Sequence, residues 1–282
     1  LTDKDFLVLN NTKVIPARLF SVKDTGAKIE IFLVREIEKT VWIALIKPSK
    51  RVKPKMVLTI GEKLSVEILE KIDDKWKIKL NYSGNIFEIL GEYGNIPLPP
   101  YIERNMTDEQ YKSLDFQRYQ TVYAKHEGSV AAPTAGLHFS DAIFEKLEAK
   151  GVCKAFVNLN VGLGTFKPVK VADIEKHQMD SEKFEIPEES AEAINRALKD
   201  GKNIVAVGTT SVRTLEKTMQ KYGKIIPVQD SSELFIYPGF EFKIVNKIIT
   251  NFHLPKSTLL MLVSAFAGKD FIFEAYRHAI EE

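Results

Sequence analysis

The sequence predicts a mixed α/β fold in which a small all-β domain interrupts an α/β domain. Short strands separated by turn signals fill residues 16–97, whereas strands alternate with helices from Gln117 onward. The chain opens with FLVLNN, residues 6–11, and such a continuous apolar run is typical of a buried parallel strand. We therefore predict an α/β domain of residues 1–15 and 98–282 and an inserted all-β domain of residues 16–97.

Composition supports a folded protein of about two domains, because 282 residues with 44% hydrophobic and 28% charged side chains can bury a large core. The net charge of +2 excludes a protein whose whole surface attracts nucleic acid. The single cysteine, Cys153, cannot form an internal disulfide, so we expect a cytoplasmic protein and a small core residue at this position. The apolar run at residues 259–266 is shorter than the roughly 20 residues that span a bilayer.

The all-β segment shows four apolar or alternating stretches with turn pairs such as Thr25-Gly26 and Asp73-Asp74 between them. They predict strands over residues 28–34, 40–46, 63–69 and 75–81. The segment GNIPLPPYI, residues 94–102, ends the domain, because its prolines prevent a regular helix or a central strand.

In the α/β segment, Ser140 is the predicted N-cap of a helix that ends at Gly151, and a strand over residues 153–159 follows. A second helix opens near Pro187 and precedes a strand over residues 203–207. The predicted buried faces are Ile143, Phe144 and Leu147 in the first helix and Ala191, Ile194 and Leu198 in the second.

The stretch IVAVGTTSVRTLEK, residues 204–217, predicts a strand, a glycine turn and a helix. Gly208 allows a ligand close to the backbone, and Thr209, Thr210 and Ser211 offer hydroxyl groups and helix caps. Free N–H groups at a helix start favour a carboxylate or a phosphate, and Arg213 can add a bidentate clamp. The alternative is an ordinary strand-to-helix cap.

Two glycine-containing loops are further candidates for ligand contact. GSVAAPTAGLHFS, residues 128–140, holds Thr134, Gly136 and His138 among few core-forming side chains, and its alternative is a tight connection with a structural histidine. VGLGTF, residues 161–166, offers Gly162 and Thr165 but lacks the third glycine and the spacing of a dinucleotide fingerprint.

Polar groups in two later stretches suit acid–base chemistry or a pocket. HQMDSEKFEI, residues 177–186, contains His177, Asp180, Glu182 and Glu185; the alternative is a solvated polar edge, which is the simpler interpretation for Glu185. TNFHLPKS, residues 250–257, sets Asn251, His253 and Ser257 before a buried apolar element. The five histidines show no metal-ligand spacing, so we expect no metal.

Positive charge is concentrated near the start, since residues 1–55 hold 12 Lys and Arg against 6 Asp and Glu. KPSKRVKPK, residues 47–55, carries five basic residues and no acid, a run that can follow a phosphate backbone. The equal alternative is a solvated hairpin edge whose lysines prevent aggregation.

Long motifs in fixed order resemble the S-adenosylmethionine:tRNA ribosyltransferase-isomerase family of bacterial queuosine synthesis, over residues 5–282. They are LNNTKVIPARLF (9–20), PLPPYI (97–102), RYQTVYA (118–124), GSVAAPTAGLHF (128–139), VGLGTF (161–166), VGTTSVRTLE (207–216) and TNFHLPKSTLLMLVSAFAG (250–268).

The resemblance implies an α/β barrel-like domain with an all-β domain, in a cytoplasmic monomer that needs no metal. It implies transfer and isomerisation of the ribosyl group of S-adenosylmethionine, the co-substrate, onto the aminomethyl-deazaguanine wobble base in the anticodon loop of tRNA. The products would be epoxyqueuosine, adenine and methionine. The alternatives are a non-catalytic RNA-binding module and an S-adenosylmethionine-dependent RNA methyltransferase.

This reaction suggests roles for the candidate residues. The methionine carboxylate needs the cationic or N–H-rich site at residues 209–213. A base must take the acidified ribose proton, and His138, His177 and His253 are candidates, while Glu182 or a histidine serves the departing adenine. The residues expected to bind S-adenosylmethionine are Thr134, Gly136, Gly162, Thr165, Thr209, Thr210, Ser211, Arg213, Asn251 and Ser257. Those expected to contact RNA phosphates are Arg18, Lys47, Lys50 and Arg51.

Two positions depart from the family pattern. Asn160 stands where the family typically has a histidine before VGLGTF, and Asp180 replaces the second histidine of H-x-M-H-x-E. Neither lost imidazole can be the base in this chain. The family's usual N-terminal lead-in and aromatic-rich C-terminal tail lie outside the printed sequence.

Overall fold

The computed structural model describes residues 1–23, 25–99, 102, 109–162 and 174–282. The chain divides into two compact units. The α/β unit comprises Leu1–Thr12, Thr121–His126 and Pro133–Glu282, and the β-rich unit comprises Lys13–Gln120 and Glu127–Ala132. No helix among the described residues is both long and apolar enough to cross a membrane.

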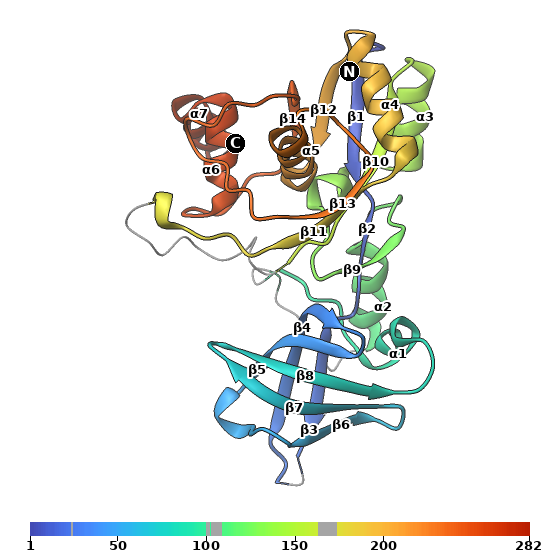
Figure 1. Ribbon diagram of the computed structural model, residues 1–282, viewed down its shortest axis with the longest axis vertical. Helices are drawn as coiled ribbons and strands as arrows, with labels where there is room; N and C mark the ends of the chain where they lie inside the picture. The colour runs from blue at the N-terminus through green and yellow to red at the C-terminus, as the bar shows by residue number, and fades with distance from the viewer. Residues whose placement is uncertain (24, 100–101, 103–108, 163–173) are drawn as a thin grey trace. The chain divides into compact units, whose positions relative to one another are not determined.

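The α/β unit is built on a six-stranded mixed sheet in the order β13-β11-β10-β1-β12-β14 (Figure 1). The central strand β1 (Asp5–Asn10) runs parallel to β10 (Cys153–Leu159) and β12 (Asn203–Val207), and β14 (Lys247–Ile249) runs parallel to β12. The antiparallel strands β11 (Glu182–Ile186) and β13 (Val228–Ser232) complete the other edge. The predictions of a buried parallel opening strand and of strands 153–159 and 203–207 are confirmed.

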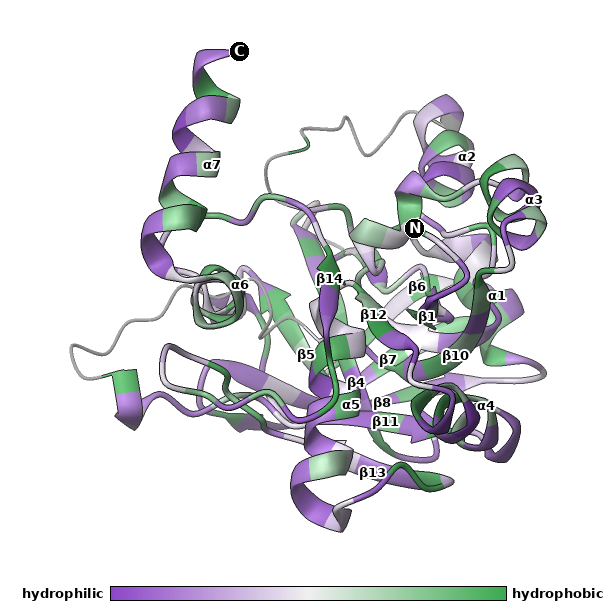
Figure 2. Ribbon diagram, turned by 90° about the horizontal axis from the view of Figure 1, so that it is seen from above, coloured by the Kyte–Doolittle hydropathy of each residue, from purple (hydrophilic) through white to green (hydrophobic). Residues whose placement is uncertain are grey.

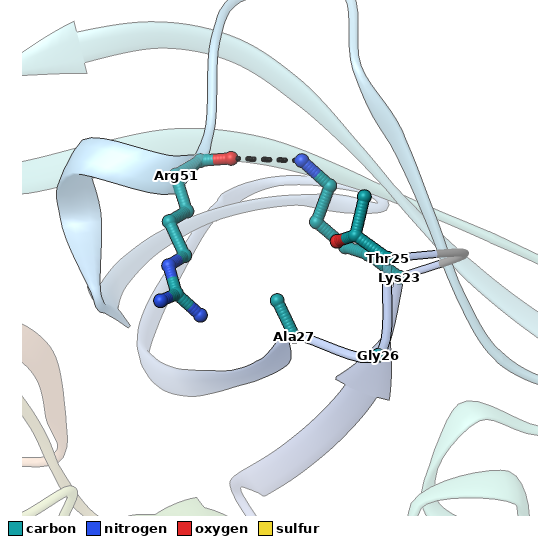
Figure 3. Close-up of a pocket in the computed structure, with 5 residues that line it drawn as sticks. All are labelled: Lys23, Thr25, Gly26, Ala27 and Arg51. Carbon is teal, nitrogen blue, oxygen red and sulfur yellow. Dashed lines mark hydrogen bonds between the residues drawn. The ribbon is translucent and has the colours of Figure 1, made fainter.

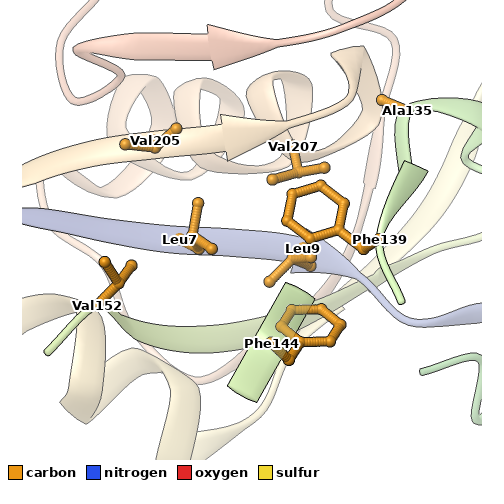
Figure 4. Close-up of a cluster of buried hydrophobic side chains, with 8 residues drawn as sticks. All are labelled: Leu7, Leu9, Ala135, Phe139, Phe144, Val152, Val205 and Val207. Atoms are coloured by element: carbon orange, nitrogen blue, oxygen red, sulfur yellow. The ribbon is translucent and has the colours of Figure 1, made fainter. Parts of the chain in front are cut away.

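One face of this sheet packs on aromatic side chains, as Figure 4 shows. Alternate residues of the strands point to the same face of a sheet, so Leu7 and Leu9 share this core with Val205 and Val207. Phe139 and Phe144 cover them, with ring centroids 5.3 Å apart. Every residue of β1 is buried, so the opposite face is covered as well.

Two helices of the α/β unit, α3 and α4, begin at the predicted residues. Ser140 Oγ accepts a hydrogen bond from Ile143 N at the start of α3, and Pro187 is the N-cap of α4. The helices are η2 (Thr134–His138), α3 (Asp141–Ala149), η4 (Ile174–Lys176), α4 (Glu188–Lys199), α5 (Thr209–Tyr222), α6 (Thr258–Ala267) and α7 (Lys269–Glu281).

Three burial predictions are wrong. Cys153 is exposed, because it opens β10 instead of lying within the buried stretch that ends at Leu159. Ile143 and Leu198 are also exposed, since the buried positions of α3 and α4 centre on Phe144 and Ile194.

The β-rich unit contains a six-stranded antiparallel sheet in the order β3-β4-β5-β8-β7-β6. Its edge strands meet, because Ser21 Oγ of β3 donates a hydrogen bond to the Thr59 carbonyl of β6 at 2.7 Å. The four predicted strands are confirmed as β4, β5, β7 and β8. The strands are β3 (Arg18–Val22), β4 (Lys28–Glu38), β5 (Val41–Lys47), β6 (Val57–Gly61), β7 (Leu64–Ile72) and β8 (Lys75–Tyr82).

Several short elements were not predicted. The helices α1 (Ile86–Tyr93) and α2 (Glu109–Arg118) belong to the β-rich unit, and η1 (Ser49–Arg51) interrupts its basic run. The strands β2 (Thr12–Val14) and β9 (His126–Ser129) form a separate two-stranded sheet.

Candidate functional site

The carboxyl ends of β10, β1, β12 and β14 meet at one edge of the α/β sheet, because these neighbouring strands run parallel. Ligands of open α/β sheets bind outside this edge. The segments that leave it contain Asn10, Asn160, the threonine pair after Gly208, and Asn251. Four of the sequence motifs therefore converge at one place, which we name the strand-end site.

Asn10 ties three strand ends together and is fully buried. Its Nδ2 donates to the Leu159 carbonyl at 3.0 Å and to Thr210 Oγ1 at 3.2 Å, and its Oδ1 accepts from Leu159 N at 3.0 Å. Sequence reasoning missed this residue. A buried parallel strand that ends in two asparagines was the available signal, since strand ends carry functional polar groups.

Asn160 lies close to the same network. Thr12 Oγ1 donates a hydrogen bond to Asn160 Oδ1 at 3.2 Å, and Thr12 N donates to Asn10 Oδ1 at 3.2 Å. The position that departs from the family pattern is therefore a hydrogen-bonded part of the site.

The start of α5 is buried, and its hydroxyl groups do not cap the helix. The N-cap is Gly208, whose φ of 83° is a left-handed conformation that favours glycine. Ser211 Oγ donates to the Val207 carbonyl at 2.8 Å, and Thr210 Oγ1 accepts from Asn10. The prediction that these hydroxyls cap the helix is wrong, because the strand-end network engages Ser211 and Thr210 instead.

Glu182 and Arg213 form a buried ion pair between β11 and α5. Arg213 Nη2 lies 2.5 Å from Glu182 Oε2, and the two side chains are 2% and 4% exposed. Glu182 Oε1 also accepts a hydrogen bond from Gly162 N at 2.9 Å. Glu182 thereby connects the segment after β10 to α5. The Nε and Nη1 groups of Arg213 have no hydrogen-bond acceptor among the described residues.

His138 and Asn251 meet, although 113 residues separate them in sequence. The His138 imidazole is exposed, and its Nε2 lies 2.6 Å from Asn251 Oδ1. Because an amide oxygen is an acceptor, the neutral tautomer that fits this contact is the one with its proton on Nε2 and its lone pair on Nδ1. Ser257, further along the same loop, caps α6 by accepting from Leu260 N at 3.2 Å.

His253 occupies a drier position than His138. Its Nε2 lies 3.1 Å from Thr250 Oγ1, and burial lowers the pKa of the imidazole to about 4. Tyr276 Oη of α7 accepts from His253 N at 2.5 Å and donates to the His253 carbonyl at 3.2 Å. The imidazole is therefore neutral at pH 7, and its backbone is fixed to α7.

The loop that carries Thr134 and Gly136 packs on Tyr123. A Cβ added at Gly136 would lie 2.0 Å from Tyr123 Oη, so glycine is needed here for packing. Burial raises the pKa of the Tyr123 phenol, and its hydroxyl has no hydrogen-bond partner within the described ranges. Thr134 begins η2 and is half-buried. Sequence reasoning assigned no role to Tyr123.

The remaining predicted residues fall into separate places. His177 contacts Phe235, with ring centroids 5.1 Å apart, and no described contact links it to the strand-end network. Gly162 meets Glu182, as given above, and Thr165 lies outside the described residues.

The predicted phosphate contacts belong to the β-rich unit. Lys47, Lys50 and Arg51 are exposed, whereas Arg18 pairs with Glu30 Oε1 at 3.2 Å and lies over the Phe32 ring. Figure 3 shows the Arg51 side chain in a hollow of about 530 Å³ that Lys23 and residues 25–27 also line. Lys23 Nζ donates to the Arg51 carbonyl at 3.2 Å, so two cationic residues line this hollow.

Comparison with known proteins supplies the family. A family model described as queuosine biosynthesis protein matches residues 1–282. S-adenosylmethionine:tRNA ribosyltransferase-isomerase of Clostridioides difficile is 50% identical, with 100% of this chain and 82% of the relative covered. The protein of that name from a Sulfurihydrogenibium species is 53% identical, over 99% of this chain and 80% of the relative.

A solved structure is also similar in sequence. The crystal structure of S-adenosylmethionine tRNA ribosyltransferase from Thermotoga maritima is 37% identical and covers 100% of this chain and 78% of that one, with a TM-score of 0.48. The match of the family model to residues 1–282 and the two relatives with at least half of the aligned residues identical decide the assignment: the chain belongs to the queuosine biosynthesis protein family.

Proposed function

We propose that the protein transfers and isomerises the ribosyl group of S-adenosylmethionine onto the aminomethyl-deazaguanine wobble base of tRNA. The products are epoxyqueuosine in the RNA, adenine and methionine. Family membership supports the reaction. The structural observation that best supports it for this chain is the strand-end site. Its polar groups come from four motifs and lie where α/β sheets bind small ligands.

The start of α5 holds the methionine carboxylate in this proposal. A helix N-terminus offers N–H groups and a partial positive charge, and the polar residues Thr209 and Thr210 are buried there. Arg213 contributes positive charge behind them, although Glu182 already balances much of it. We expect Thr134 and Gly136 of η2 and Gly162 after β10 to enclose the rest of the nucleoside, and Thr165, outside the described residues, stays a candidate from the sequence.

We assign the base to His138. The Nε2 contact with Asn251 leaves Nδ1 free to accept the ribose proton. His253 is less suited, because a pKa of about 4 makes its imidazole a weak base at neutral pH. Asn251 is then a positioning residue, since it selects the tautomer of His138 and fixes its ring.

Glu182 acts as a positioning residue rather than as the donor to adenine. Both of its oxygens are engaged, one by Gly162 N and the other by Arg213. The sequence offered Glu182 or a histidine for protonating the departing adenine, and we propose His177 for this role.

Lys47, Lys50 and Arg51 contact RNA phosphates in this proposal, because they are exposed cations in a run without acids. Arg18 contributes less, since Glu30 already pairs with it. We also propose that the β-rich unit, predicted as an all-β domain of residues 16–97 but containing α1, is inserted into a barrel-like domain, and that the protein is a cytoplasmic monomer that needs no metal. The family resemblance supports these points.

The test incubates the protein with S-adenosylmethionine and an anticodon stem-loop that carries the modified base. Adenine and methionine in equal amounts, with a matching gain of RNA mass, support the proposal. Release of S-adenosylhomocysteine would indicate a methyltransferase. RNA binding without adenine release would indicate a non-catalytic RNA-binding module.

A further inference from the structure

Phe252 presents its ring to solvent beside the strand-end site. It is 62% exposed and stands between Asn251, which contacts His138, and His253. Because loops beside a binding site often carry functional contacts, this exposed ring is a candidate contact for a ligand.

The ring is held in place by α7. Phe252 and Tyr276 make an edge-to-face contact, with ring centroids 4.7 Å apart and planes at 89°. The Tyr276 hydroxyl bonds to both the N–H and the carbonyl of His253, the next residue. The backbone beside Phe252 is therefore anchored, and the ring is an ordered surface.

The loop that carries Phe252 contains no acidic residue. Residues 250–257 contain one lysine, the exposed Lys256, and no Asp or Glu. An exposed aromatic ring on such a loop can bind single-stranded nucleic acid, because unpaired bases stack on aromatic side chains.

We propose that Phe252 is a stacking platform for an unpaired base of the substrate RNA that neighbours the reacting base. This inference rests on the proposed function, which brings an anticodon loop to the strand-end site. The ring adds affinity for RNA and places the reacting base, while it takes no part in binding S-adenosylmethionine.

The chain offers a matched control in Phe271. Its ring is 65% exposed, it lies on α7, and α7 alternates between hydrophilic and hydrophobic residues along its length (Figure 2). Phe271 and Tyr276 are five positions apart, so their side chains leave the helix in different directions. Phe271→Ala therefore removes a similarly exposed apolar ring but leaves Phe252 and its contact with Tyr276 intact.

The experiment compares Phe252→Ala, Phe252→Trp and Phe271→Ala. Stem-loop affinity is measured by fluorescence anisotropy, and adenine release gives KM for both substrates. We expect Phe252→Ala to raise the Kd and KM for RNA about 5- to 150-fold, which is the range for loss of one base–aromatic stack. The KM for S-adenosylmethionine stays unchanged. Phe252→Trp and Phe271→Ala remain within about twofold of wild type, because one keeps a stacking ring and the other leaves Phe252 intact.

A fluorescent 2-aminopurine on either side of the wobble base reports the stack directly. We expect quenching with wild type and Phe252→Trp, and none with Phe252→Ala. The proposal is overturned if Phe252→Ala binds RNA like wild type, if Phe271→Ala loses as much, or if wild type does not bind the stem-loop. Absence of adenine release with wild type would refute the proposed reaction alone, since anisotropy and quenching would still decide the role of Phe252.

Discussion

The buried ion pair between Glu182 and Arg213 allows a quantitative prediction. Removal of one partner leaves the other charge buried and unpaired, since the Glu182 and Arg213 side chains are only 4% and 2% exposed. Breaking such a pair costs about 3–5 kcal/mol. For a urea m-value of about 3 kcal/mol/M, each single substitution lowers the unfolding midpoint by about 1–1.7 M. We expect this loss for Glu182→Gln and for Arg213→Met.

Glu182→Gln is the sharper of the two substitutions. A glutamine oxygen can still accept from Gly162 N, so the loss reports the ion pair rather than that hydrogen bond. The double variant Glu182→Gln, Arg213→Met removes both charges, and we expect it to cost at least 2 kcal/mol less than the two single losses together, given about 3–5 kcal/mol for each.

Circular dichroism in the far ultraviolet is the appropriate probe, because both tryptophans, Trp42 and Trp76, lie in the β-rich unit and would not report on this pair. Lys63→Met is the control, since the Lys63–Glu92 pair is exposed and its loss should leave the midpoint unchanged. Single-variant shifts below about 0.3 M, an effect of only about 1 kcal/mol, or additive losses in the double variant would refute the reasoning.

Three further predictions concern the site. His138→Gln should lower kcat about 100-fold or more without unfolding the protein, as measured by adenine release, and an unchanged kcat would exclude it as the base. Because burial lowers the pKa of His253 to about 4, the unfolded state takes up a proton before the folded state does as pH falls below about 6.5. Stability should therefore fall between pH 6.5 and 4, and urea titrations of His253→Gln should show a flatter dependence in that window. Gly136→Ala should destabilise the protein by about 1–3 kcal/mol, because the added methyl group clashes with the Tyr123 hydroxyl. In thermal melts, the second substitution Tyr123→Phe should restore part of this loss. If it restores none, the clash with the hydroxyl is not the cause.

Much of the fold is determined locally. The buried strand that ends at Asn10 can be recognised from its own run of apolar residues. The starts of α3 and α4 can likewise be recognised from single residues, Ser140 and Pro187. Burial at element ends was less predictable. Cys153 is apolar in character, yet it is exposed because it lies at the open end of its strand.

The family motifs identified which segments matter, because they are long and keep their order in the sequence. They did not show which side chains touch. His138 and Asn251 are 113 residues apart, and Asn10 and Thr210 are 200 apart, so only the parallel sheet brings them together. The sequence assigned Arg213 to a ligand, whereas the folded chain pairs it with Glu182.

The sequence by itself determined the elements, the family and the set of candidate residues, since these depend on local patterns and on motif identity. The tertiary structure decided the hydrogen-bond partners, the neutral state of His253 and the anchoring of Phe252. Burial and long-range contact set these properties, and both arise only when the strand ends and α7 are packed together.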